Sequence, residues 1–273
     1  MLQFTRRSFI KCSALASLAL LPGNPFARQS ACAASLLTPE NYYLAHKKEL
    51  TDAFIDTLQG VAQFLEPELG TAQTKKVTQQ ALSRFEALLP QLPDVGGERN
   101  PDTEFIPIAA WYIALYEPMK AAGKTPADLG KLIYDLNVFS LSSYPPAQAL
   151  STKENLFSPA GLNELRDWAA WTQRRELSGN WVATFIPSEG QNFDYGINYT
   201  ECGLVKYLKS QGLSELSPYV CLNDFPKSQI LGTGLQRTKT IANGDGICNF
   251  RYKKDRPVTQ NWSTEIAGIH TRK

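Results

Sequence analysis

The sequence predicts an α+β fold, in which a helical N-terminal region is followed by a small antiparallel β-sheet with inserted helices. Two observations predict it. From residue 39 to about residue 177, apolar side chains recur at steps of three and four, the period of a helix. From residue 181 the chain becomes β-branched and aromatic in short alternating runs. With 273 residues, 43% of them hydrophobic and 20% charged, the composition is that of a globular protein with a full core.

The helices are expected in a fixed order along the first two thirds of the chain. Residues 39–92 predict two helices, the second over about 71–89, and prolines at 90 and 93 end it. Further helices are expected over about 105–122, 125–136 and 158–177. The last two begin with Thr-Pro and Ser-Pro, a capping residue followed by a proline in the first turn. The polar, proline-containing stretch 140–157 is expected to be irregular.

Four strands are expected in the remainder, over residues 181–186, 193–199, 235–242 and 247–252. The last two are joined by Asn243-Gly244-Asp245-Gly246, a strong hairpin signal. Residues 202–230 between the strands have a helical pattern. Residues 255–273 are expected to form a loosely held tail.

The N-terminus predicts an export signal. Arg6-Arg7 and a short apolar run resemble a twin-arginine signal peptide, with cleavage expected after Ala33. The predicted organisation is therefore a signal over 1–33, a helical region over 34–100, a main domain over 101–254 and a tail over 255–273. We expect a periplasmic or otherwise exported protein that uses the Tat translocase during export.

Charge and hydropathy limit the classes of partner. Removal of residues 1–33, which contain four Lys or Arg and no Asp or Glu, changes the formal net charge from +2 to −2. No basic stripe is found, so nucleic-acid binding is not expected. No apolar run reaches the roughly 20 residues of a membrane helix, so no integral membrane segment is expected in the mature chain.

The cysteines give the first indication of chemistry. Cys202, Cys221 and Cys248 remain after cleavage, and an odd number in an oxidising compartment indicates a free thiol, a metal ligand set or an intermolecular bridge. The two histidines, His46 and His270, are distant in sequence from this cluster, so a Ser-His-Asp or Cys-His pair is not supported.

Two cysteines have acidic neighbours. Cys221 and Asp224 are three residues apart, on one face of a helix, where the carboxylate can orient the thiol or exchange a proton with it. The alternative is a buried cysteine and a capping aspartate. Cys202 follows Glu201 at a predicted strand-to-helix junction, where helix N–H groups would lower the thiol pKa; the alternative is simple packing. Cys248 shares a strand face with Phe250 and is the most readily buried.

The C-terminal half of the mature chain resembles the L-2-amino-thiazoline-4-carboxylic acid hydrolase family, over about residues 100–252 and most clearly from residue 195 onward. The segments that carry the resemblance are Glu201-Cys202, Glu215-Leu216 with Pro218, Cys221-Leu222-Asn223-Asp224, Arg237-Thr238-Lys239-Thr240-Ile241-Ala242 and Cys248-Asn249-Phe250-Arg251. Asn249 departs from the family, whose members often have Asp there.

The resemblance implies a hydrolase that opens a small cyclic amidine ring with water. The candidate catalytic residues are Cys221, Asp224, Cys202 and Glu201, with a cysteine thiolate attacking the amidine carbon. The candidate substrate-binding residues are Arg237, Thr238 and Arg251, because an arginine pair can clamp a carboxylate. This interpretation requires no cofactor.

Two other classes of function stay open. Thiolates of Cys202, Cys221 and Cys248 with Asp224 or Glu201 would fill a tetrahedral site for zinc or another soft metal, and the Cys-x-x-Asp spacing is faintly similar to that of organomercurial lyases. A non-catalytic exported binding protein, with two of the cysteines in a disulfide, is the third possibility.

Overall fold

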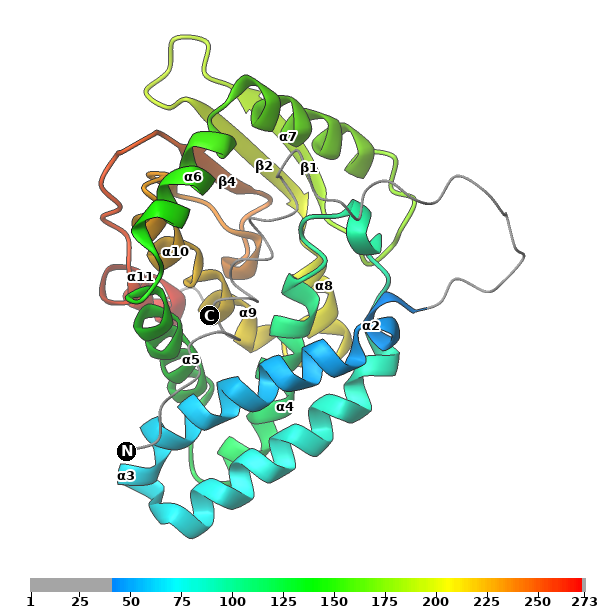
Figure 1. The fold of residues 1–273 in the computed structure, drawn as a ribbon, viewed down its shortest axis with the longest axis vertical. Helices are drawn as coiled ribbons and strands as arrows, with labels where there is room; N and C mark the ends of the chain where they lie inside the picture. The colour runs from blue at the N-terminus through cyan, green and yellow to red at the C-terminus, as the bar shows by residue number, and fades with distance from the viewer. Residues whose placement is uncertain (1–40, 272–273) are drawn as a thin grey trace, which may run out of the picture.

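The computed structural model describes residues 41–271, with side chains to residue 269 (Figure 1). The predicted export signal and the side chain of His270 lie outside these residues. The predicted α+β class is confirmed: helices dominate, and one four-stranded antiparallel sheet lies in the C-terminal part. No helix in the described part of the chain is both long and apolar enough to cross a bilayer.

The N-terminal region forms a bent helix that packs on a buried one. The elements are α2 (Tyr42–Ala45), α3 (Lys47–Leu88), two 3-10 turns, η2 (Leu89–Gln91) and η3 (Gly97–Arg99), and α4 (Phe105–Ala121). Gly70 has φ 74°, which breaks α3 into the two predicted helices. The arms fold back on each other, so that the rings of Phe54 and Phe85 lie 4.6 Å apart (Figure 1).

Helix α4 is the centre of the main core. It is apolar on nearly every side, and its side chains, from Ile106 to Met119, are almost all buried. The same hydrophobic cluster takes side chains from α3 and from helices much later in the chain, including Leu208 and Val220. The N-terminal helical region therefore shares one core with the segment that carries the cysteines.

Three helices follow α4, namely α5 (Pro126–Leu141), α6 (Pro146–Leu156) and α7 (Pro159–Thr172). Thr125 and Asp128 form a capping box that starts α5. The expectation of an irregular stretch over 140–157 is wrong, because α6 occupies most of it. Its prolines lie before and at the first helical turn, where a missing N–H costs no hydrogen bond, so they start the helix rather than break it.

The sheet has the strand order β1-β2-β4-β3, all antiparallel. Its strands are β1 (Val182–Pro187), β2 (Tyr195–Glu201), β3 (Gln236–Arg237) and β4 (Cys248–Tyr252). The predicted strand 235–242 is too long. Beyond Arg237, the Asn249 side chain accepts the N–H groups of Thr238 and Lys239 at 3.0 and 2.6 Å. The ladder therefore ends, and a 3-10 turn, η5 (Ile241–Asn243), follows.

The helices inserted between β2 and β3 are short. They are α8 (Gly203–Ser210), the 3-10 turn η4 (Ser214–Leu216), α9 (Ser217–Cys221) and α10 (Asp224–Leu231). Their positions confirm the helical pattern expected for 202–230. They connect the sheet to the α4 core, because α8 and α9 contribute to the main hydrophobic cluster.

The C-terminal tail is not loosely held as expected. Residues Trp262–Thr271 form helix α11, and the Trp262 ring lies 5.5 Å from Tyr134 and 5.9 Å from Tyr219. Gln260 also accepts the backbone N–H of Arg237 at 2.9 Å. These contacts are long-range, so no local sequence signal gives them.

Trp262→Ala should lower the free energy of unfolding by about 2 kcal/mol, less than the loss for a fully buried tryptophan because the ring is only half-buried. Urea denaturation measures the change. Ser263→Ala, on the exposed side of the same helix, is the matched control and should stay within about 0.5 kcal/mol of the wild type. Equal stability of all three proteins would mean that α11 is not docked in solution.

Candidate functional site

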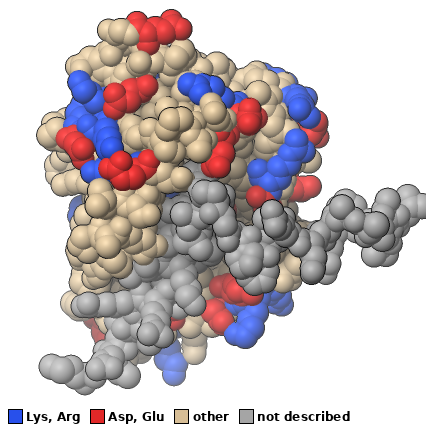
Figure 2. Space-filling model, turned by 45° about the horizontal axis from the view of Figure 1, so that its top comes forward, with Lys and Arg blue, Asp and Glu red and all other residues tan. Residues whose placement is uncertain are grey.

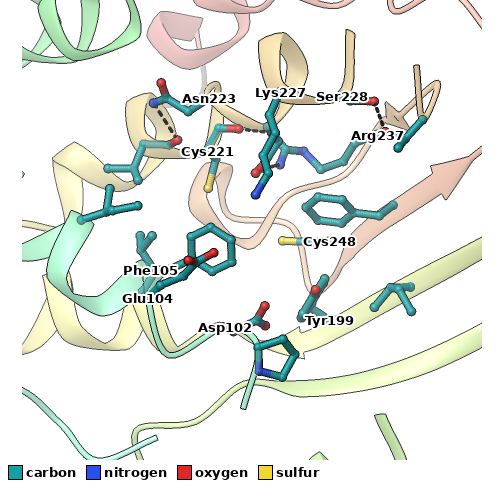
Figure 3. Close-up of a pocket in the computed structure, with 18 of the residues that line it drawn as sticks. Asp102, Glu104, Phe105, Tyr199, Cys221, Asn223, Lys227, Ser228, Arg237 and Cys248 are labelled. Atoms are coloured by element: carbon teal, nitrogen blue, oxygen red, sulfur yellow. Dashed lines mark hydrogen bonds and ion pairs between the residues drawn. The ribbon is translucent and has the colours of Figure 1, made fainter. Parts of the chain in front are cut away.

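A cavity of about 330 Å³ lies between the sheet, the inserted helices and the N-terminal end of α4 (Figure 3). Cys202, Cys221 and Cys248 line it, together with Asp224 and Arg237. These five residues come from the ends of β2, α9, α10, β3 and β4. Residues that are distant in the sequence therefore converge on a single cavity.

Cys221 and Asp224 lie at the junction of two short helices. Cys221 is the last residue of α9 and Asp224 the first of α10. Between them, Asn223 donates to the Tyr112 hydroxyl at 3.0 Å and accepts from Asn137 at 3.0 Å. Because these partners belong to α4 and α5, the junction is fixed to the rigid core.

Arg237 joins this junction to the sheet. Its Nη1 donates to Asp224 Oδ2 at 2.5 Å, and its Nη2 donates to the Cys221 carbonyl oxygen at 2.9 Å. The guanidinium carbon lies 5.0 Å from the ring centroids of both Phe225 and Phe250. The Arg237 side chain is 4% exposed, whereas that of Asp224 is 37% exposed. The arginine is thus a buried clamp, and the carboxylate remains accessible from the cavity.

Burial controls protonation at this end of the cavity. It raises the pKa of the Cys221 thiol well above its usual value, with Arg237 acting in the opposite direction. It also raises the pKa of Asp224, against the opposing charges of Arg237 and Lys227. Cys221 is therefore a neutral thiol at neutral pH, and it needs a base to become a nucleophile.

Cys202 precedes α8, as predicted, but its pKa shifts in the other direction. Burial raises the pKa of its thiol to about 12, and the N–H groups of Val205 and Leu204 offset only part of this effect. The N–H groups at the start of the helix lower the pKa as expected, but burial outweighs them and the net shift is upward. The cause is desolvation, which cannot be inferred from the position of a residue in a helix.

Cys248 is the most buried cysteine, at 5% exposure, as its place beside Phe250 predicts. The backbone N–H of Ile241 donates to its sulfur at 3.2 Å, and the Thr240 hydroxyl lies 3.5 Å away. The turn η5, which replaces the end of the expected strand, supplies this N–H. In Figure 3 the sulfurs of Cys248 and Cys221 face the same space.

Asp102 is a cavity residue that the sequence analysis missed. It is 9% exposed, and among the residues that the structure describes no hydrogen-bond partner reaches its Oδ2. Burial raises its pKa to about 7, while Lys227 acts to lower it and Asp224 to raise it. In Figure 3 it lies on the opposite side of the cavity from Lys227.

Asn100 holds the Asp102 backbone in place. Its side chain accepts the Asp102 N–H at 3.0 Å and the Trp168 indole N–H at 3.1 Å, and donates to Val95 and Asn180. The only local signal for Asp102 was a polar Asn-Pro-Asp turn ahead of an apolar helix. Such turns are common, so the signal is weak.

Three predicted site residues do not line the cavity. Glu201 forms ion pairs with Arg175 and Lys206 outside it. Thr238 is exposed and bonds to the Asn249 side chain. Arg251 donates to Asn198 at 2.9 Å and lies over the Phe193 ring. Arg237 pairs with Phe250 in the sheet and therefore lies on the other face from Arg251, so the two arginines form no clamp.

In the part of the chain that the structure describes, Cys202, Cys221 and Cys248 are free thiols and form no disulfide. Within residues 41–271, no group of three His, Cys, Asp or Glu side chains has the arrangement of a metal site. On the face shown in Figure 2, Lys and Arg side chains are interspersed with Asp and Glu. A thiol, a carboxylate and a guanidinium in one cavity can take part in acid–base and nucleophilic chemistry.

Comparison with known proteins gives one match. The family model described as L-2-amino-thiazoline-4-carboxylic acid hydrolase matches residues 105–252, which is more than half of the chain. Neither the curated proteins nor the solved structures contain a match. The matched segment includes the three cysteines, Asp224 and Arg237, whereas Asp102 lies just before it.

Asp102→Asn should stabilise the protein by ~3 kcal/mol more at pH 8 than at pH 4. The wild-type carboxyl has a pKa of about 7 when folded and an ordinary value of 3.8. Between these values the unfolded chain loses its proton first, so the stability falls as the pH rises. Asparagine removes this loss.

Urea denaturation at pH 4, 6 and 8 measures the difference in stability. Asp167→Asn, at an exposed position on α7, is the control and should change stability little at any pH. A difference between Asp102→Asn and the wild type that does not vary with pH would show that Asp102 titrates as an ordinary carboxylate.

Proposed function

Because the chain belongs to the L-2-amino-thiazoline-4-carboxylic acid hydrolase family, we propose that it opens the ring of a small cyclic amidine at a C–N bond with water. The observation that supports this proposal is the arrangement of Cys221, Asp224 and Arg237 at one end of a cavity. A thiol, a carboxylate and a fixed cation are the groups that such a reaction needs.

The charged groups suit a substrate with two poles. Lys227 and the guanidinium of Arg237 line the cavity and can attract a carboxylate. Asp102, on the other side, has an oxygen without a hydrogen-bond partner among the described residues, and it can accept the N–H groups of an amidinium. A bound cation would also favour the charged form of Asp102, because opposite charges stabilise ionisation.

In the proposed reaction, Cys221 Sγ bonds to the amidine carbon while its proton passes to Asp224. The proton then goes to the ring nitrogen as the C–N bond breaks, which leaves a covalent intermediate on Cys221. Water adds to the same carbon, the C–S bond to Cys221 breaks, and the thiol regains a proton. One substrate and one water molecule are consumed in total.

The proton transfer to a carboxylate is necessary because the Cys221 thiol is neutral at rest. Burial raises its pKa well above the usual value, so little thiolate is present before the substrate binds. Asp224 is three residues away at the helix junction, and its side chain remains 37% exposed. We therefore assign it the role of base and then acid. Glu201 is already ion-paired outside the cavity and takes no part in this step.

Cys221→Ala should lower the rate of hydrolysis of L-2-amino-thiazoline-4-carboxylate at least ~1,000-fold, because the covalent step is lost. Loss of the ring absorbance measures the rate. Cys202→Ala is the matched control, since it removes a second buried thiol of the same cavity, and we expect less than a tenfold change. A larger loss of hydrolysis rate in Cys202→Ala than in Cys221→Ala would mean that Cys202, and not Cys221, is the nucleophile. Wild-type rates in both variants, with every thiazoline tried, would eliminate the proposal.

Export through the twin-arginine route is part of the proposal, on the strength of Arg6-Arg7 and the following apolar run. Expression of the full chain in a bacterium should give a periplasmic product shortened to begin after Ala33, detected by fractionation and intact mass. Arg6→Lys with Arg7→Lys should keep it in the cytoplasm at full length. Cytoplasmic, full-length wild-type protein would eliminate this part alone.

A further inference from the structure

Most of the cavity wall is not accounted for by the reaction. The residues with assigned roles lie on β3, α9, α10 and the segment before α4. Helices α5, α6 and α7 line a further part of the wall, mostly with apolar side chains, beside apolar and aromatic side chains of α4 and the sheet. The main ones from α5, α6 and α7, together with one from the end of α10, are Ile133, Leu141, Leu156, Leu165, Trp168 and Leu231.

The two parts of the wall differ in charge. From α5, α6 and α7, all of which the structure describes in full, no charged side chain lines the cavity, and the only polar ones are Asn137 and Thr152. Asn137 is already bonded to Asn223. The charged side chains that line the cavity come from the segment before α4, from α10 and from β3, and they are Asp102, Glu104, Asp224, Lys227 and Arg237. The part of the wall with these charges is the charged end of the cavity, and the part formed by α5, α6 and α7 is its apolar end.

The volume of the cavity is also larger than a small charged substrate needs. Its volume of about 330 Å³ falls within the roughly 300–1,000 Å³ of sites that hold drug-sized molecules. An amino-thiazoline carboxylate, comparable in size to a single amino acid, would leave much of this space to water against apolar side chains. Such a wall adds nothing to the binding of a small charged molecule, but it favours an apolar group strongly.

We propose that the substrate is amphipathic: a polar ring at the charged end carries an apolar substituent of roughly six to ten carbon atoms that lies among α5, α6 and α7. This inference rests on the proposed function for the identity of the ring. The apolar subsite itself rests only on the wall and the volume. It assigns the chain to compounds in which a heterocycle bears an alkyl or aryl group, in preference to the bare amino acid derivative.

The test is isothermal titration of Cys221→Ala, which binds without turnover, with 2-(alkylamino)-thiazoline-4-carboxylates bearing methyl, butyl and octyl groups. Each buried methylene contributes about 0.8 kcal/mol, or a factor of about 4 in affinity. Allowing for incomplete burial, we expect the octyl compound to bind at least ~30-fold more tightly than the methyl compound. A second series, butanoate to decanoate, carries the carboxylate without the ring and should show the same trend.

Leu165→Trp in the same background fills the apolar end from α7, and Leu156→Phe fills it from α6. Each should reduce the octyl-to-methyl ratio to below about 3-fold, while binding of the methyl compound changes less than about 3-fold. Glu164→Trp is the matched control, because it places the same side chain on the exposed face of α7. Glu164→Trp should keep the octyl-to-methyl affinity ratio of the Cys221→Ala background. Thermal unfolding confirms that each variant is folded.

The outcomes separate the two proposals. Thiazolines that bind with no dependence on chain length would overturn the apolar subsite and leave the proposed function standing. Dependence on chain length in the alkyl carboxylates, with no binding of any thiazoline, would support the subsite and eliminate the proposed ring chemistry. A chain-length effect that persists in both filled variants would place the substituent elsewhere and overturn the inference.

Discussion

The ion pair of Arg237 with Asp224 is the interaction on which the site depends. It ties a two-residue edge strand to the junction of α9 and α10, and the same guanidinium holds the Cys221 carbonyl. Removing a cation from water is costly, and the aromatic rings of Phe225 and Phe250 offset only part of that cost. Since an apolar pair of similar volume often gives equal or greater stability, the arginine is better explained by the geometry that it imposes.

Burial links the stability of the protein to its chemistry. A carboxylate such as Asp102, with a pKa of about 7, destabilises the fold at neutral pH, yet the Asn100 network holds its backbone firmly in place. The thiols of Cys202 and Cys221 are kept neutral by the same desolvation. Groups held in a costly state by a rigid surrounding are typical of binding and catalytic sites. A charged substrate would relieve that cost, and an apolar substituent would displace water from the other end of the cavity.

The N-terminal helical region is part of the site and not an appendage to it. Helices α3 and α4 share one hydrophobic cluster with α8 and α9. The loop between α3 and α4 places Asp102 in the cavity, just outside the segment that matches the family. The family model matches only residues 105–252, so one charged wall of the cavity comes from the chain before the matched segment.

The sequence by itself determined the α+β class, the break in the first long helix and the helices between the strands, and it named Cys221, Asp224 and Arg237 among its candidate site residues. Helical and strand periods and turn residues are short-range signals, and they were sufficient for the fold features. Only the tertiary structure decided the rest. It shortened β3 through Asn249, docked α11 on Tyr134, and separated Arg251 from Arg237 by a sheet face. It also brought Asp102 to the cysteines and reversed the pKa shift expected for Cys202, because burial depends on residues distant in the chain.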